Sequence, residues 1–163
     1  MSSNDKASTS LTRLYARPGF LLRRAHQISA AVFEDECRQL ALTPAQFGVL
    51  TVLQSHPGMG QSSLARALGF DKVTVLRVLR GLESRGLVAR SPAPDNKRNV
   101  SVSLTPQGCS LLAQAQRPAE KAYKRLLAPL DREQQAQLLE LLQLLTGELE
   151  DHARAAFVPP MKI

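Results

Sequence analysis

Three cations and two aliphatic residues between positions 72 and 80 share one face of a predicted helix, and together they suit an anionic partner. They are Lys72, Val73, Leu76, Arg77 and Arg80. The opposite face is aliphatic, as in a helix packed on a core. A helix with cations on its exposed face fits the DNA major groove. The planar fork of an arginine matches the two acceptors on a guanine edge, so we predict that Arg77 reads a guanine.

Neighbouring side chains extend this candidate DNA-binding surface. Val73 and Leu76 can contact thymine methyl groups, which predicts A/T pairs within the bound half-site. Ser62 and Ser63 begin the preceding helical pattern, where their hydroxyl groups can contact phosphates or can instead cap the helix. For the cations, plain solvation on a helix surface is the alternative.

A helix-turn-helix would position these residues. The periodicity predicts helices over residues 61–68 and 71–85. Ala65 lets two helices approach closely, and Gly69 supplies the positive φ of a tight turn. Asp71 can cap the second helix by accepting from its first N–H groups.

A β-hairpin with a basic tip is predicted after the second helix. Residues 87–90 form one strand, and the alternation VSVSL at 100–104 forms the other, with aliphatic side chains inward and serines outward. The tip carries Asp95, Asn96, Lys97 and Arg98. We predict that Asn96, Lys97 and Arg98 lie at the DNA, the two cations in or beside a narrow minor groove. A solvated loop tip is the alternative.

Helical patterns also occupy both ends of the chain. Proline at a first helical position predicts helices starting near Pro18, Pro44 and Pro106, and Asp131 can cap a last helix that runs to about Ala156. That helix has a heptad-like leucine seam: Leu138, Leu142, Leu145 and Leu149. Terminal helices this apolar favour a dimer. We therefore expect a polar tail at 1–10, a winged lobe at 41–105 and a helical dimerisation region at 11–40 and 106–158.

The charge distribution agrees with a DNA-binding lobe. The 163 residues carry a net charge of +7. Residues 60–105 hold eight Lys and Arg against three Asp and Glu, so five of the seven excess positive charges lie there. No apolar stretch is long enough for a membrane span, and the polar start resembles no secretory leader, which predicts a cytoplasmic protein.

Catalysis and metal binding have no support in the sequence. There is no GxSxG, phosphate loop or HExxH, and no cluster with metal-ligand spacing, so we expect neither an enzyme nor a cofactor. Cys37 and Cys109 lie far apart without a CxxC pattern. They are expected to be reduced packing residues, with a thiol-based redox sensor as the alternative.

Three segments in order resemble the MarR family of winged-helix transcriptional regulators across about residues 11–150. LTPAQFGVL is similar to the family's second-helix pattern, SSLARALGFDKVTVLRVLRGLESRGLVAR to its helix-turn-helix, and NKRNVSVSLTPQG to its wing. The resemblance implies a mainly α homodimer with a small β-hairpin wing. It also places Lys72, Thr74 and Arg77 near DNA. In the family, an acidic wing residue braces the wing arginine; here Asn96 takes that position, and Asp95 can brace Arg98 from one residue earlier.

The resemblance further implies that a small anionic or phenolic compound binds between the dimerisation helices and the DNA lobe. Our candidate effector residues are Phe20, Arg23, His26, Phe33 and Phe47, because a cation, an imidazole and aromatic walls suit an aromatic carboxylate. The alternative is a histidine in a dimer interface beside a surface arginine. We thus expect a homodimeric repressor on a pseudo-palindromic operator, released by an aromatic acid and controlling genes for its catabolism or efflux.

Overall fold

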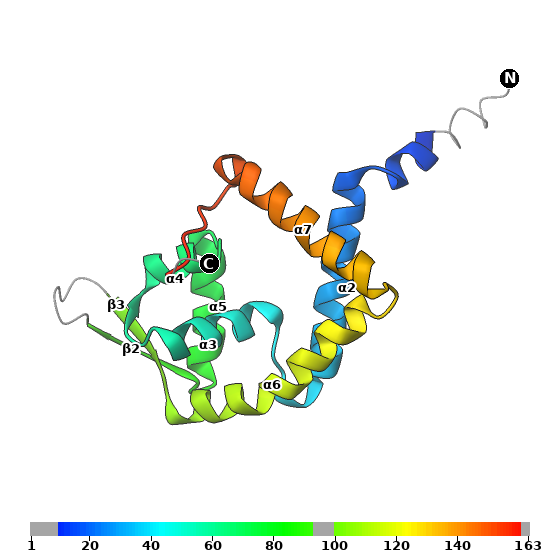
Figure 1. The fold of residues 1–163 in the computed structure, drawn as a ribbon. Helices are drawn as coiled ribbons and strands as arrows, with labels where there is room; N and C mark the ends of the chain where they lie inside the picture. Colours follow the sequence, from blue (N-terminus) through cyan, green and yellow to red (C-terminus); the bar gives the residue numbers. More distant parts are fainter. Residues whose placement is uncertain (1–9, 93–99, 161–163) are drawn as a thin grey trace, which may run out of the picture.

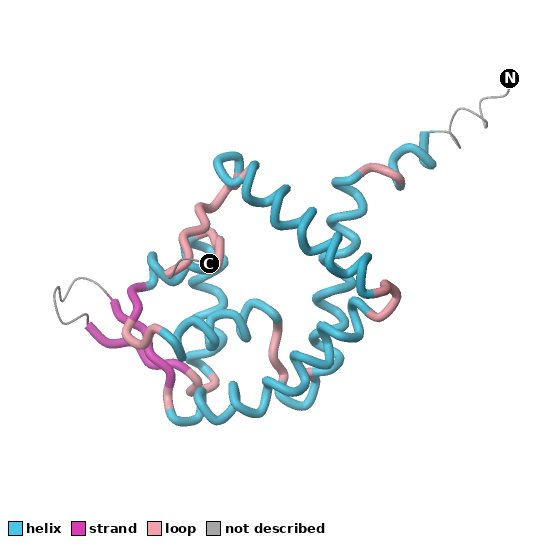
Figure 2. Tube along the Cα trace, viewed as in Figure 1, coloured by secondary structure: helices cyan, strands magenta, loops and turns pink. Residues whose placement is uncertain are grey.

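The computed structural model describes residues 10–92 and 100–160, which are mainly helical with one small sheet (Figures 1 and 2). A short helix at 10–15 precedes the main elements. In chain order these are α2 (Pro18–Glu36), the 3₁₀ helix η1 (Arg38–Leu40), α3 (Pro44–Ser55), β1 (Met59–Gly60), α4 (Gln61–Ala67), α5 (Lys72–Ser84), β2 (Val88–Pro92), β3 (Val100–Leu104), α6 (Pro106–Leu127), α7 (Arg132–Glu148) and η2 (Glu150–His152). The predicted fold class, mainly α with a β-hairpin wing, is confirmed.

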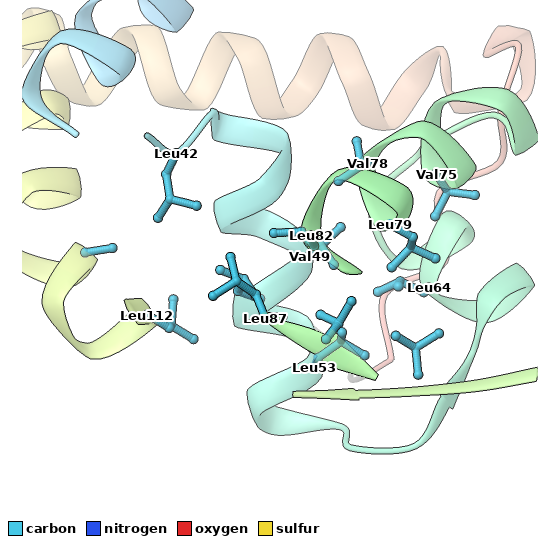
Figure 3. Packing of buried hydrophobic residues seen from close by; sticks show 14 of the residues in the cluster. Leu42, Val49, Leu53, Leu64, Val75, Val78, Leu79, Leu82, Leu87 and Leu112 are labelled. Carbon is cyan, nitrogen blue, oxygen red and sulfur yellow. The ribbon is translucent and has the colours of Figure 1, made fainter. Parts of the chain in front are cut away.

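One hydrophobic core joins α3, α4 and α5 to the sheet and continues into α2 and α6 (Figure 3). Leu50, Leu64, Leu79 and Leu82 are completely buried there, and Leu53 is 1% exposed. Each fully buried leucine contributes about 1.5–3 kcal/mol to stability. This core holds the helix-turn-helix as a rigid lobe.

Local capping sets the starts of the helices in this lobe. The Thr43 hydroxyl and the Gln46 side chain form a reciprocal capping box at α3. Asp71 accepts from Thr74 N–H at the start of α5, at 2.6 Å. Gly69 has φ 61° between α4 and α5, and Gly86 has φ 68° after α5, as the turns predicted there require.

The sheet has one strand more than the sequence predicts. Its order is β1-β3-β2, all antiparallel, and β1 is too short to show alternation. Val102, predicted to point inward, is completely buried. Ser101, predicted on the opposite face, is also only 5% exposed, because it lies between Gly60 and Ser91 of the two neighbouring strands and its hydroxyl group lies 2.9 Å from that of Ser91. Val100, predicted to point inward, is 41% exposed beside Pro92, towards the wing tip.

The long helix α6 packs against α2, and ion pairs line this contact. Lys121 Nζ lies 2.7 Å from Glu36, and Arg125 Nη1 lies 2.6 Å from Asp35 and 2.9 Å from Glu36. Hydrogen bonds from Arg125 to Asp35, and from Lys121 and then Arg125 to Glu36, lower the pKa of both carboxyl groups.

These lowered pKa values predict a loss of stability in acid. A carboxyl group with a lower pKa in the folded state stabilises the fold at neutral pH, and that contribution disappears as the pH falls below about 4. The urea midpoint of the wild type should therefore drop more between pH 6.5 and pH 3.5 than that of Arg125→Gln. Equal drops in the two proteins would contradict this role of the ion pairs.

α7 differs in length from the predicted helix and buries none of its residues. It ends at Glu148 rather than near Ala156. Phe157 N–H donates to Glu150 and Val158 N–H donates to the Arg66 carbonyl at 2.8 Å, which holds the following segment extended beside α4 (Figure 1). Pro159 and Pro160 also disfavour helix in the residues before them.

Candidate nucleic-acid interface

α5 presents the predicted cationic face to solvent. Lys72, Arg77 and Arg80 are exposed, and Val73 is 75% exposed. Thr74 and Leu76 are half-buried at the borders of this face. The opposite side is buried in the lobe core: Val75, Val78, Leu79 and Leu82. The structure thus brings together the α5 residues that the sequence analysis selected.

The start of α5 is fixed by a charged cap. The Thr74 backbone N–H, followed by its hydroxyl group, lowers the pKa of Asp71, and Arg77 adds an attractive charge. The carboxylate therefore satisfies the first turn of α5 and partly offsets its positive helix end. This defines the position from which Lys72 and Val73 project.

Ser62 and Ser63 are exposed in the first turn of α4. The N-cap of α4 is Gly60, which has no capping side chain. The alternative role predicted for the two serines was to cap this helix, and α4 begins without a hydrogen bond from a capping side chain. Their hydroxyl groups remain on the surface beside α5, where they can contact phosphates.

The hairpin predicted for the wing is present at its base, where Arg90 pairs with Val102 and Pro92 with Val100. Asp95, Asn96, Lys97 and Arg98 lie outside the described residues. Sequence reasoning missed Arg90, whose Nε lies 3.2 Å from Glu83 on α5. This ion pair connects the base of the wing to α5, and no periodicity in the sequence indicates that Arg90 and Glu83 are close.

The candidate effector residues fall into two clusters, one near each end of α2, rather than one pocket. Near its start, Arg23 lies over the Phe20 ring, 5.0 Å from the centroid, and Phe20 contacts Tyr15. Near its end, Phe33 packs on Phe47 with centroids 5.5 Å apart. Thirteen residues separate Phe20 from Phe33, which is about 20 Å along a helix. Within one chain, these clusters cannot enclose one small molecule.

The first of these clusters is open to solvent. Arg23 and His26 are both exposed, and Arg23 donates to Gln27 at 3.3 Å. The second cluster lies where α2, α3 and α6 meet and includes a residue that the sequence analysis missed. Tyr123 of α6 lies 6.2 Å from the Phe33 ring, centroid to centroid. Helical spacing alone could not place it there.

The two cysteines differ in burial. Cys37 is completely buried, and burial, together with the nearby Glu36 charge, raises the pKa of its thiol. Cys109 is exposed on α6. A raised pKa keeps a thiol protonated and unreactive.

We therefore expect different reactivities for the two thiols. Ellman's reagent at pH 7.5 should modify Cys109 rapidly in the folded protein and Cys37 only after unfolding. Cys109→Ser should remove the fast phase, and Cys37→Ser should leave it unchanged. A fast reaction in the folded Cys109→Ser variant would favour the redox-sensor alternative.

Among the residues that the structure describes, no three His, Cys, Asp or Glu side chains gather as a metal site would require. None of the described helices is both long and apolar enough to cross a bilayer.

Comparisons with known proteins agree with this geometry. The model of the MarR family matches residues 42–100, from the start of the lobe into β3. The chain is 32% identical over 131 residues to a putative transcriptional regulatory protein for the hcr operon of Thauera aromatica, which covers 78% of this chain and 77% of that protein.

Solved structures extend the similarity beyond the lobe. BpsR of Bordetella bronchiseptica has a TM-score of 0.75 and 31% identity over 81% of this chain and 94% of that chain; its structure concerns regulation of DNA binding by 6-hydroxynicotinic acid. The transcriptional repressor CouR, bound to a 23-mer DNA duplex, has a TM-score of 0.74 and 33% identity over 82% of this chain and 94% of that chain.

Proposed function

The chain belongs to the MarR family of DNA-binding transcriptional regulators, which are not enzymes, and from that premise we propose that it is a homodimeric repressor released by an aromatic carboxylate. The observation that carries the proposal is the face of α5, with Lys72, Arg77 and Arg80 exposed on a helix that the lobe core holds rigid. Ser62, Ser63 and the wing add contacts to phosphates and the minor groove.

The need for a second copy follows from the surface of the terminal helices. Leu139, Leu141, Leu144, Leu145 and Leu149 are each 43–62% exposed, and α2 adds Leu21, Leu22 and Ile28. α7 buries none of its residues in the single chain, and an amphipathic helix without tertiary packing is unstable. Exposed apolar surface of this size is typical of a protein–protein interface. A two-fold dimer would cover these helices and place two copies of α5 in successive major grooves, about 34–36 Å apart.

The class of effector follows from Arg23, His26 and Phe20, supported by the ligand named for BpsR. A carboxylate would pair with the Arg23 guanidinium, and His26 lies one turn along the same helix. Phe33 lies farther along α2 and packs on Phe47 of α3, where α2 meets the DNA lobe, so this contact would respond to ligand binding through the packing of α2. The dimer would exist in two conformations, and only one of them could place both copies of α5 in the DNA. A ligand that binds the other conformation more tightly would lower the fraction of protein bound to DNA.

The proposal is tested by screening monocyclic aromatic carboxylates, 6-hydroxynicotinic acid included, for a rise in melting temperature and for release of bound DNA. A ligand that binds the folded dimer raises its melting temperature. Arg23→Ala should weaken the affinity for the ligand about tenfold or more, since one charged hydrogen bond contributes roughly 1.5–3 kcal/mol.

Arg24→Ala is the matched control, because Arg24 is also exposed and donates to the same Gln27 oxygen, at 3.0 Å. It should respond like the wild type. If the two variants respond equally, Arg23 does not bind the carboxylate. If no aromatic carboxylate stabilises the wild type, the effector class is wrong.

A further inference from the structure

Two chain segments connect the dimerisation helices to the DNA lobe, and both contact the end of the recognition helix α5. The first is the junction between α2 and α3, formed by η1 and Ala41. The second is the turn from β3 into α6, at Thr105 to Gly108. The three residues after α5 that receive these contacts, Arg85, Gly86 and Leu87, are called the α5 end here.

Arg85 makes the contact with the first connection. Its Nη1 donates to the Ala41 carbonyl at 2.7 Å, and its Nη2 donates to the Leu40 carbonyl at 2.8 Å. These carbonyl groups lie 44 and 45 residues away in the sequence. In the described part of the chain, no carboxylate forms an ion pair with Arg85, so its guanidinium group binds only the two carbonyl groups of the junction.

The junction itself is conformationally demanding. Ala41 has φ 47°, the left-handed region that a residue with a Cβ rarely adopts, and its N–H donates to Arg38 at 3.1 Å. Leu42, which follows it, is 2% exposed. The two hydrogen bonds from Arg85 therefore hold a strained turn whose direction determines how α2 enters the lobe.

Gly86 and Leu87 make the contact with the second connection. The Thr105 hydroxyl donates to the Gly86 carbonyl at 2.6 Å, and Thr105 N–H donates to the Leu87 carbonyl at 3.1 Å. A Cβ on Gly108 would lie 2.0 Å from the Leu87 oxygen, so α6 touches this backbone directly. Both covalent connections between the dimerisation helices and the lobe thus meet at the α5 end.

We propose that Arg85 is a positioning residue for DNA reading, whose paired hydrogen bonds to Leu40 and Ala41 set the direction of α5 relative to the dimerisation helices. The guanidinium does not touch DNA in this account; it acts through the junction. A movement of α2, on effector binding, would reach α5 through these two bonds as well as through the contact between Phe33 and Phe47. The inference rests on the proposed two-site operator, because the direction of α5 in each protomer fixes the spacing of the half-sites.

The test compares operators whose half-sites are moved closer or farther apart by one and two base pairs. Binding to this series and to random duplex DNA is measured at one salt concentration. The variants are Arg85→Met, which removes both donors, and Arg85→Lys, which keeps the charge and a single donor group. Arg117→Met is the matched control for the lost charge, because Arg117 is exposed on α6 and the side-chain donor to the Leu40 and Ala41 carbonyl groups is Arg85.

Wild type and Arg117→Met should prefer one spacing by about tenfold. Arg85→Met should lose most of this preference, to within about threefold, while its affinity for random DNA matches that of Arg117→Met. Arg85→Lys should recover part of the preference. Hydrogen exchange should report the same change locally, with faster exchange of the Leu40 and Ala41 amides in Arg85→Met alone.

Other outcomes separate the inference from the function on which it rests. If Arg85→Met binds every operator equally more weakly and keeps the wild-type spacing preference, Arg85 only stabilises the fold and the inference is wrong. If the wild type has no spacing preference, the proposed two-site operator is wrong. Unchanged exchange at Leu40 and Ala41 would also overturn the inference.

Discussion

The double variant Leu141→Glu, Leu144→Glu is expected to be monomeric and to bind operator DNA roughly 100-fold more weakly, since a single lobe loses the gain from binding two linked half-sites. These leucines are 62% and 58% exposed in the single chain and lie three residues apart on α7. Burying two carboxylates in an apolar interface is far more costly than leaving them in water. Sedimentation analysis and fluorescence anisotropy measure the two effects.

Gln143→Glu is the control for the added charge. Gln143 is exposed on α7, about 200° around the helix from Leu141. This variant should remain dimeric and should retain its DNA affinity within about threefold. If the double variant is also dimeric, α7 does not form the interface through this face, and the proposed assembly is wrong.

Gly108→Ala is expected to destabilise the protein by roughly 3 kcal/mol, at the upper end of typical overpacking costs. The new Cβ would lie 2.0 Å from the Leu87 oxygen and 3.0 Å from its carbon. Both are backbone atoms, so neither can rotate away, and the first turn of α6 must move from the α5 end. Urea unfolding at a fixed protomer concentration measures the change in free energy.

Gly81→Ala is the matched control within the same lobe. A Cβ there would meet the Gln46 amide nitrogen at 3.5 Å, an ordinary contact with a flexible side chain. Alanine also favours helix over glycine by about 1 kcal/mol, so this variant should be as stable as the wild type or more stable. Similar stabilities for the two variants would show that α6 does not need glycine at position 108.

Residues close together in the sequence allowed most of the fold to be predicted. Thr43, Asp71 and Thr105 each cap a helix through a backbone N–H three residues on, so sequence alone predicted those starts. The exposed face of α5 followed from the spacing of Val75, Val78 and their neighbours.

The features that sequence could not predict depend on contacts between distant segments. Arg85 donates to the Leu40 and Ala41 carbonyl groups, more than 40 residues away in the sequence. Because every residue has a backbone carbonyl group, the residue types do not indicate which ones Arg85 binds. The segment after α7 is held beside α4 by the hydrogen bond from Val158 N–H to the Arg66 carbonyl. The separation of Phe20 from Phe33 is different, because thirteen residues of one helix span about 20 Å and the sequence spacing alone therefore argued against a shared site within one chain.

Selection of bound sequences from random duplex DNA by the full-length protein tests the central claim most directly. We expect enrichment of an inverted repeat whose half-sites lie one helical turn apart, with A/T pairs in each half and a guanine that loses its enrichment in Arg77→Ala. Enrichment of no sequence, or of a single unrepeated site, would contradict a homodimer that reads DNA with two copies of α5.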